Sequence, residues 1–390
     1  PTAETVDYQQ YLSSLKRWRA NGLPFTQFIK NQTVAIAESD QLIGKRVLII
    51  AAKIDSKKET EAICRFAKDN NFPLFADIQS SQSGKQNNLH YYDLLLINEA
   101  FISLLQQADI IIQFGEQLIS KRLTELMGSF EGELQLIKSG ETRIDANHQL
   151  DIRYNCNAIE WIKAQALTPS KLNNSWFEAL KKCHQGIAQK VIDPFLAKQL
   201  FSEMTIVNQL DKLLIKDKPL FIGNSMPIRL ADMLMNSNQA EIFTNRGASG
   251  IDGLLATAVG VAKKSKNITT LLIGDSSFLY DLNSLALLKQ LETSFIIIVI
   301  NNDGGAIFNM LPVPEAQRSN FYQLPHGLNF KASCEQFCID YHNPNQLIDF
   351  AETYNQCLQG KHSLIEVTLE NQQSATQLEQ LKEQVKYATS

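Results

Sequence analysis

Two short polar segments hold the residues of this chain that are best suited to bind a metal ion and a phosphate group. Residues 274–277 read Gly-Asp-Ser-Ser and residues 301–305 read Asn-Asn-Asp-Gly-Gly, and each segment directly follows a run of apolar residues. If both runs are strands of an open parallel sheet, the segments lie at the carboxyl ends of the strands, where ligands bind. We therefore expect Asp275 and Asn302 to face one site.

The residue types in these segments suit Mg²⁺, which prefers oxygen ligands and usually takes only a few of them from protein. Asp275, Asn302 and the main-chain carbonyl of Gly304 would leave room for phosphate oxygens and a water molecule. Each segment alone also fits a structural role, the first as a helix cap and the second as a polar turn. Their occurrence together, each after a buried strand, favours a binding site.

The two segments together resemble the cofactor motif of thiamine diphosphate enzymes, although Ser276 stands where most of that superfamily has glycine. Residues 245–253, 279–283 and 302–308 resemble more narrowly the 2-succinyl-5-enolpyruvyl-6-hydroxy-3-cyclohexene-1-carboxylate (SEPHCHC) synthase family, known as MenD. The resemblance implies a transferase that uses thiamine diphosphate and Mg²⁺, with Mn²⁺ as a possible substitute. It would decarboxylate 2-oxoglutarate and add the succinyl carbanion to isochorismate in menaquinone biosynthesis.

The resemblance also implies a cofactor site. Asp275, Asn302 and Gly304 would hold the metal ion, and Ile251 would support the bent form of thiamine, although it also suits a core position in a helix predicted over 249–263. The residues expected around the cofactor are Ser249, Gly250, Ile251, Gly274, Asp275, Ser276, Ser277, Asn302, Gly304, Gly305, Ala306 and Ile307.

The substrates implied by the resemblance are dianions, which an acidic protein must hold with local basic residues. Arg229 and Arg246 each follow a predicted strand end, and Lys121 with Arg122 follows a strand end in the first half of the chain. A basic residue on a helix usually faces solvent. The resemblance instead implies that Arg229 and Arg246 bind substrate, and it implies this less firmly for Lys121 and Arg122. The residues expected at the reacting centre are Ser225, Arg229, Arg246, Ile251, Lys121 and Arg122, with Phe308 and Leu311 as an apolar wall.

Short apolar runs alternate with helical periodicity along the chain, which predicts an α/β protein of two three-layer α/β/α domains with mostly parallel sheets. The boundary is placed at residue 188, after a leading helical segment near 8–18. The resemblance implies that residues 1–188 are a central linking domain and that residues 189–390 bind the diphosphate side of the cofactor. The predicted strands are 46–51, 72–76, 108–114, 133–137, 219–222, 241–244, 269–273, 295–300 and 363–367. The predicted helices are 57–70, 176–190, 195–214, 249–263 and 282–291.

Composition narrows the classes of function. The 390 residues carry a formal net charge of −4, which gives no overall attraction to nucleic acid. Apolar runs such as 295–300 are far shorter than the roughly 20 residues of a membrane-spanning helix, so we expect no stable membrane insertion. The six scattered cysteines predict free thiols in a cytoplasmic protein.

Two other patterns are weak. Cys334, Cys338 and His342 recur every four residues, but three ligands on one helix rarely close a tetrahedral metal site and no fourth ligand is apparent. Residues 114–117 lack the spacing of a dinucleotide fingerprint, so we expect no nicotinamide or flavin in the first domain.

The chain opens on Pro1, and no segment resembles the family's N-terminal pyrimidine-binding domain, which carries the glutamate that protonates the aminopyrimidine ring. We therefore expect a fragment with little turnover, whose partner is that domain in an intact homodimer or homotetramer. Two alternatives stay open. One is another thiamine diphosphate-dependent 2-oxoacid decarboxylase or carboligase, and the other is a non-catalytic binding subunit.

Overall fold

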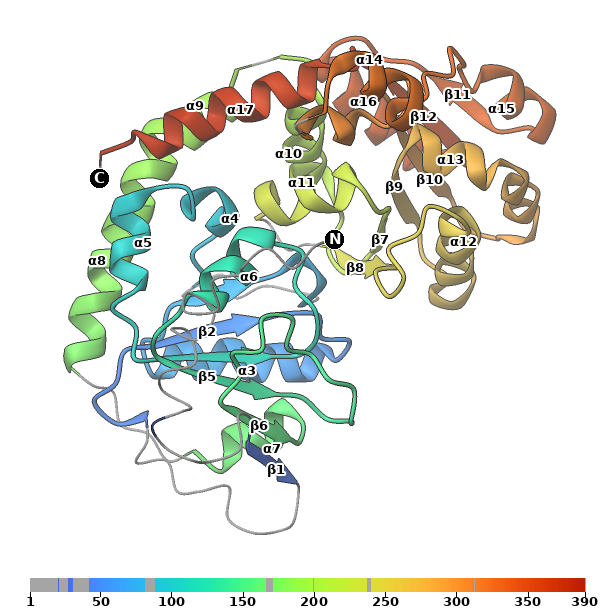
Figure 1. Cartoon of the computed structure of the whole chain (residues 1–390). Coiled ribbons are helices and arrows are strands. Elements are labelled where there is room, and N and C mark those ends of the chain that lie inside the picture. Colours follow the sequence, from blue (N-terminus) through green and yellow to red (C-terminus); the bar gives the residue numbers. More distant parts are fainter. Residues whose placement is uncertain are drawn as a thin grey trace, which may run out of the picture.

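Two six-stranded parallel sheets form the framework of the chain in this computed structural model. The structure describes residues 20, 27–30, 42–80, 88–165, 171–198, 200–236, 240–311 and 313–389. The strand order is β1-β6-β5-β4-β2-β3 in the first sheet and β11-β12-β10-β9-β7-β8 in the second. Figure 1 shows the two sheets in separate halves of the molecule, the first coloured blue to green and the second yellow to red. The predicted fold class, two α/β domains with parallel sheets, is confirmed.

The first sheet contains the four strands predicted for it and two more. Its strands are β1 Gln27–Lys30, β2 Val47–Ala51, β3 Leu74–Ala76, β4 Ile110–Phe114, β5 Glu133–Ile137 and β6 Ile152–Asn155. The two strands that the sequence did not predict, β1 and β6, pair with each other in parallel. Both have four residues with polar side chains among the apolar ones, so neither resembles a buried strand.

The second sheet contains all five strands predicted for it. Its strands are β7 Pro219–Ile222, β8 Glu241–Thr244, β9 Thr269–Gly274, β10 Phe295–Asn301, β11 Asp340–His342 and β12 His362–Thr368. All seven residues of β10 are buried, because helices cover both faces of a parallel sheet and a central strand can then be apolar throughout. The additional strand, β11, has three residues and lies at the sheet edge.

Helices cover the faces of both sheets. In the first half they are α3 Lys57–Asp69, η2 Ile78–Ser80, α4 Tyr92–Leu95, α5 Glu99–Leu105, α6 Lys121–Gly128, α7 Ala158–Lys163 and α8 Lys171–Ile187. Next come η3 Ala188–Ile192, α9 Asp193–Leu196, α10 Glu203–Leu213, α11 Met226–Leu234, α12 Leu254–Ser265, α13 Asp275–Tyr280 and η4 Leu282–Gln290. The last are η5 Ala306–Met310, α14 Glu315–Arg318, η6 Ser319–Gln323, α15 Lys331–Phe337, α16 Leu347–Cys357 and α17 Gln373–Lys386. The helical linker predicted near 8–18 lies outside the described residues.

Three helix predictions need correction. The helix expected over 195–214 is divided into α9 and α10, because Ser202 is extended and caps α10 through the N–H of Thr205. The helix expected from 249 begins only at Leu254, because Gly253 adopts a positive φ of 68° that ends the preceding loop. The segment 282–291 forms the tighter 3₁₀ helix η4.

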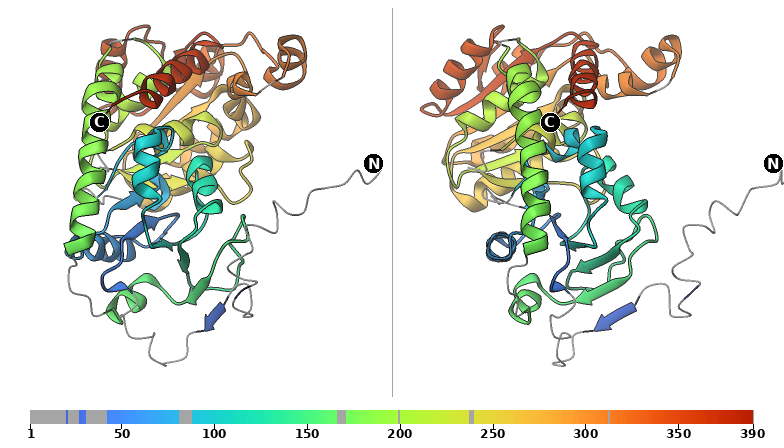
Figure 2. Two further views of the ribbon diagram at one scale, coloured as in Figure 1. Left: turned by 60° about the vertical axis from the view of Figure 1, so that its left-hand side comes forward. Right: turned by 90° about the vertical axis from the view of Figure 1, so that its left-hand side faces the viewer.

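A long helical segment connects the two halves. Helix α8 continues through the π-helical turn η3 into α9, so the chain is helical across residue 188, where we placed the domain boundary. Figure 2 shows this green segment along one side of the molecule, next to the C-terminus. The boundary itself stays a prediction.

The two halves share one apolar core. Each sheet has a separate apolar cluster on the face that points away from the other sheet. The two faces that point toward each other share a single cluster, which includes Leu48 and Ile111 of the first sheet and Leu220 and Ile298 of the second. Polar contacts join the halves as well. Buried Asp232 accepts hydrogen bonds from the Ile78 N–H at 2.8 Å and the Tyr92 hydroxyl at 2.7 Å.

The C-terminal helix α17 also ties the halves together. It extends from the second sheet toward α9 (Figure 1), and Asn98 of the first half donates from Nδ2 to the carbonyl of Val385 at 2.9 Å. None of the helices that the structure describes is long and apolar enough to cross a membrane. All six cysteines are free. Cys338 ends α15 with a left-handed conformation, so Cys334, Cys338 and His342 do not share one helix.

Candidate functional site

A cavity of about 300 Å³ lies at the carboxyl ends of β7, β9 and β10. From the adjacent strands β7 and β9 the sheet extends in opposite directions, to β8 on one side and to β10 on the other. Such a switch point is where ligands bind in open α/β sheets. The sequence-predicted residues that line the cavity are Ser225, Ile251, Gly274, Asp275, Ser276, Ser277, Asn302, Gly304, Gly305, Ala306, Ile307 and Phe308.

The Asp275 carboxylate joins the two polar segments. It is 2% exposed, and its Oδ2 accepts the N–H of Asn302 at 3.1 Å and the N–H of Gly304 at 2.8 Å. Its Oδ1 accepts the N–H of Ser276. The loop after β10 is therefore held against the loop after β9, and the three residues predicted to bind the metal ion lie together.

Two glycines allow the chain to fold tightly beside the cavity. Gly304 has a φ of 106°, and a Cβ atom there would lie 2.2 Å from the carbonyl oxygen of Gln323. The N–H of Gly305 donates to that same oxygen at 2.7 Å. A side chain at position 304 would therefore collide with the main chain, so glycine is required for the loop to approach Asp275.

His326 is a cavity residue that the sequence did not predict. Its Nδ1 accepts the N–H of Leu328 at 3.0 Å, which places the ring proton of the neutral form on Nε2. That Nε2 lies 3.3 Å from Asp275 Oδ2. Asp303 positions the turn by accepting the N–H of His326 at 2.8 Å and of Gly327 at 2.7 Å. A single histidine in a loop gives no pattern by which the sequence could have indicated this.

The groups in this cavity fit a divalent cation with a diphosphate. A buried carboxylate and an amide side chain supply hard oxygen atoms, and Mg²⁺ needs few of these when phosphate completes its coordination. Asp275, Asn302 and Gly304 would hold the ion, with Ser276 and Ser277 close to the diphosphate. The contact that the structure shows for Gly304 is made by its N–H, so a role for its carbonyl stays a prediction. Among the described residues, no group of three or more His, Cys, Asp or Glu side chains offers another metal site.

Arg229 and Arg246 interact with each other through their charges, although neither lines the cavity itself. Arg229 follows Ser225 by one turn of α11 and donates from Nη1 to the Ser225 carbonyl at 2.7 Å. Burial and the positive charge of Arg246 lower the pKa of Arg229. Within the described part of the chain, neither guanidinium has an ion-pair partner. The opposite charge that the structure shows to act on Arg246 is buried Asp77, whose pKa burial raises and the charge of Arg246 lowers, without an ion pair between them. Two neighbouring cations of which neither is held in an ion pair are an arrangement suited to an anion.

Lys121 and Arg122 are placed differently. The Lys121 side chain is 88% exposed and pairs with Glu125 at 3.2 Å. Arg122 forms an ion pair with buried Asp93, which also accepts a hydrogen bond from Ser120. Neither basic residue lines the cavity, and each already has a carboxylate partner.

Three of the remaining predicted residues do not line the cavity, and one does. Ser249 and Gly250 are exposed, and the Gly250 carbonyl accepts a 2.6 Å hydrogen bond from the side chain of buried Asn224. Leu311 is 41% exposed and does not line the cavity. Ile251 does line it, from the loop before α12 rather than from a helix.

The sequence also missed Glu203. This residue begins α10, is 1% exposed and lines the same cavity. An acidic residue directly after a capping serine is usual at a helix start, so nothing in the sequence distinguished it.

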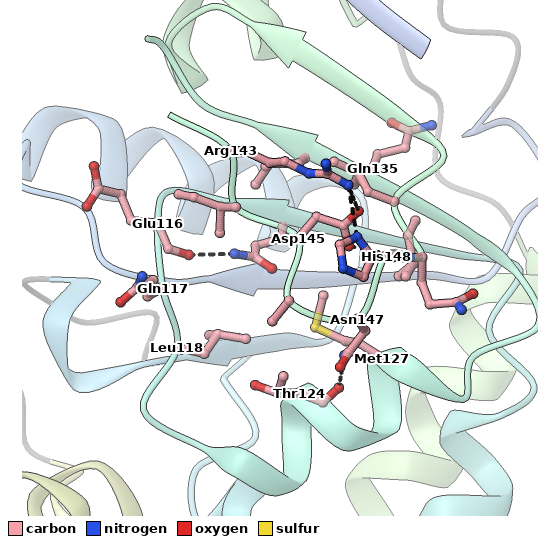
Figure 3. A pocket seen from close by; sticks show the side chains of 17 residues that line it. Glu116, Gln117, Leu118, Thr124, Met127, Gln135, Arg143, Asp145, Asn147 and His148 are labelled. Carbon is pink, nitrogen blue, oxygen red and sulfur yellow. Dashed lines mark hydrogen bonds and ion pairs between the residues drawn. The ribbon is translucent and has the colours of Figure 1, made fainter. Parts of the chain in front are cut away.

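A larger cavity, of about 490 Å³, lies in the first half of the chain (Figure 3). It is bordered by β4, β5 and the loop 143–150, where Arg143 contacts His148 Nδ1 at 2.9 Å and Asn147 donates to the carbonyl of Thr124. None of the sequence-predicted site residues lines it. The predicted residues meet at the smaller cavity instead.

Family models match nearly the whole chain. The middle domain of thiamine pyrophosphate enzymes matches residues 9–222, and the C-terminal TPP binding domain of thiamine pyrophosphate enzymes matches residues 225–367. The second match contains the segments 274–277 and 301–305 and the cavity residue Ser225. These matches define the class of protein as a thiamine diphosphate enzyme.

Curated relatives narrow the class. A protein of Psychromonas ingrahamii is 52% identical over 390 residues, covering 100% of this chain and 67% of the relative. Proteins of Vibrio atlanticus and Aeromonas salmonicida are 37% and 35% identical, over 96% and 98% of this chain and 66% and 67% of their own lengths. All three are named 2-succinyl-5-enolpyruvyl-6-hydroxy-3-cyclohexene-1-carboxylate synthase. The chain belongs to this family of thiamine diphosphate-dependent transferases, and it spans about two thirds of the length of these relatives.

Proposed function

We propose that the protein takes part in the Mg²⁺- and thiamine diphosphate-dependent synthesis of SEPHCHC in menaquinone biosynthesis. In that reaction 2-oxoglutarate loses CO₂ and the remaining succinyl unit is added to isochorismate. The observation that carries the proposal is the convergence of Asp275, Asn302 and Gly304 at the sheet's switch point, with Asp275 bonded to both loops. Family membership supports the same reaction.

Each part of the cavity has a task in this proposal. When bound, thiamine diphosphate supplies the nucleophilic carbon and the electron sink for decarboxylation. Asp275 and Asn302 would hold the metal ion, and the hydroxyl of Ser277 would donate to the diphosphate. The hydroxyl of Ser276, which donates to Asp275 Oδ1 at 3.2 Å, would turn to the diphosphate when the cofactor binds. Ile251 supports the thiamine ring, and Phe308, whose ring lies 5.6 Å from that of Tyr322, keeps water from the reacting carbon.

Substrate binding falls mainly to Arg229 and Arg246 in this proposal. Both substrates are dicarboxylates, and two adjacent guanidinium groups without ion-pair partners in the described part of the chain match that charge. Lys121 and Arg122 would have to exchange their present carboxylate partners before they could bind substrate.

The proposal includes protein partners. We infer that catalysis also requires the remaining third of the relatives' length, as the pyrimidine-binding domain, in a cytoplasmic homodimer or homotetramer. Large apolar side chains near the cavity support a protein contact there: Phe321 is 73% exposed, Leu324 61% and Leu311 41%.

A reconstitution assay tests the proposal. CO₂ release from 2-oxoglutarate and consumption of isochorismate are measured for this chain alone and after addition of the separately expressed N-terminal third of the Psychromonas ingrahamii relative. We expect little turnover alone and coupled turnover of both substrates in the mixture. An equal rate for the chain alone would refute the need for the added domain. CO₂ release without isochorismate consumption would favour a different 2-oxoacid decarboxylase, and no turnover in the mixture would refute the reaction.

A further inference from the structure

Glu203 is a buried acid in the cofactor cavity that the proposed mechanism does not use. It begins α10, where Ser202 and Thr205 form the reciprocal capping bonds, so the capping of this helix does not depend on its side chain. The residue is 1% exposed and lines the cavity together with Asp275. Its Oε2 is buried and makes no hydrogen bond of ordinary geometry to a described residue. The hydroxyl of Ser374, which also lacks such a bond, lies close enough to interact weakly with the carboxyl group.

Such a group is unfavourable unless it serves a ligand. A buried carboxyl oxygen without a partner loses its hydration, and a buried ionised carboxylate loses far more. Burial raises the pKa of Glu203 to about 7, against a smaller lowering by the Ser374 hydroxyl, and the negative charge of Asp275 adds a further increase. The N-terminal position on α10 would favour the ionised form, but burial outweighs it here. The cavity thus contains a carboxyl group that readily carries a proton.

The charges in the cavity indicate what this group can bind. A diphosphate carries more negative charge than one Mg²⁺ ion neutralises, and Asp275 contributes a further negative charge. A second ionised carboxylate in the same enclosed space would be repelled, whereas a neutral acid can donate its O–H to an anionic oxygen. We propose that Glu203 is a further binding residue of this cavity, a neutral carboxylic acid that donates a hydrogen bond to the diphosphate of the cofactor.

The proposal rests on the proposed cofactor, and two substitutions separate it from other roles. Glu203→Gln keeps a neutral donor of the same shape, whereas Glu203→Met keeps the volume and removes the donor. The dissociation constant of thiamine diphosphate with Mg²⁺ is measured by calorimetry, and so is that of inorganic pyrophosphate with Mg²⁺. Melting temperatures show that each variant is folded.

We expect Glu203→Gln to bind both ligands within about threefold of the unmodified chain. Glu203→Met should bind both about 10-fold or more weakly, the usual loss for a hydrogen bond to a charged group. The matched controls are Glu99→Gln and Glu99→Met, because Glu99 begins α5 in the same way but is exposed and far from the cavity residues in sequence and fold. Neither control should change binding.

Each other outcome overturns the inference in its own way. If Glu203→Gln binds as weakly as Glu203→Met, the negative charge is what matters and Glu203 serves the metal ion instead. If Glu203→Met binds normally, the residue is structural. A loss for thiamine diphosphate but not for pyrophosphate would place the hydrogen bond elsewhere on the cofactor. If the unmodified chain binds neither ligand, the proposed cofactor is wrong, and the proposed role of Glu203 is wrong with it.

Discussion

At the scale of single residues, the basic side chains near the site differ in what neutralises them. Arg122 is paired with Asp93 and Lys121 with Glu125. By contrast, burial and the charge of Arg246 lower the pKa of Arg229, and neither of these two arginines has an ion-pair partner in the described residues. An incoming dicarboxylate would relieve the repulsion between the two arginines. Their interaction with substrate should therefore be stronger than that of the other pair.

This difference gives the first prediction. Arg246→Gln should raise the KM for the dicarboxylate substrates about 10- to 100-fold, the range for a lost charge-assisted hydrogen bond. Cofactor affinity should change less than threefold. Both quantities are measured in the reconstituted mixture, with Arg65→Gln on the exposed face of α3 as the control. An unchanged KM would remove Arg246 from the substrate site.

At the scale of helices and strands, the sequence predicted most accurately those segments whose residues are almost all apolar. The first six of the seven buried residues of β10 form an unbroken apolar run, and their strand was predicted almost to the residue. The strands β1, β6 and β11 have three or four residues with polar neighbours, so only pairing with the adjacent strand identifies them. The loop 249–253 was predicted as helix, because a positive φ at Gly253 depends on tertiary structure rather than on periodicity.

Helix α8 carries the second prediction, which concerns stability and pH. His184 is 6% exposed and its ring lies 4.5 Å from that of His90. Burial, and secondly the charge of His90, lower the pKa of His184 from 6.5 to about 4. The unfolded chain therefore takes up a proton before the folded chain does. Stability is fully present above pH 6.5 and is lost as the pH falls from 6.5 toward 4.

At pH 5 this one group should reduce the free energy of unfolding by about 2 kcal/mol relative to pH 7.5. The glutamine of His184→Gln cannot take up this proton. Between pH 7.5 and pH 5, the free energy of unfolding of the variant should therefore fall by about 2 kcal/mol less than that of the unmodified chain. Urea unfolding at the two pH values measures the difference, and His148→Gln, at an exposed position, is the control. An identical pH dependence in His184→Gln and the unmodified chain would show that His184 titrates normally in the fold.

At the scale of the whole molecule, the alternation of strands and helices was sufficient to predict two α/β domains, and the rule for parallel sheets was sufficient to bring Asp275 and Asn302 together. The contact between the halves was not predictable. It depends on pairs such as Asp232 with Tyr92, which are 140 positions apart and leave no local pattern.

The same reason explains what was missed in the site. Glu203 and His326 reach the cavity from segments distant in sequence from the strand-end motifs, one from a helix start and one from a loop. Resemblance to a family supplied residues at motif positions only, and neither of these residues occupies one. Their roles became visible through burial and through the atoms they face.

The proposed function depends on a metal ion that joins the protein to a diphosphate through Asp275. Calorimetric titration of this chain with thiamine diphosphate, with and without Mg²⁺, is the most direct test, together with the variant Asp275→Asn and the exposed control Asp340→Asn. We predict Mg²⁺-dependent binding in the unmodified chain and in the control, and binding weaker by about 100-fold or more in Asp275→Asn. Equal binding without Mg²⁺, or an undiminished affinity in Asp275→Asn, would contradict the account.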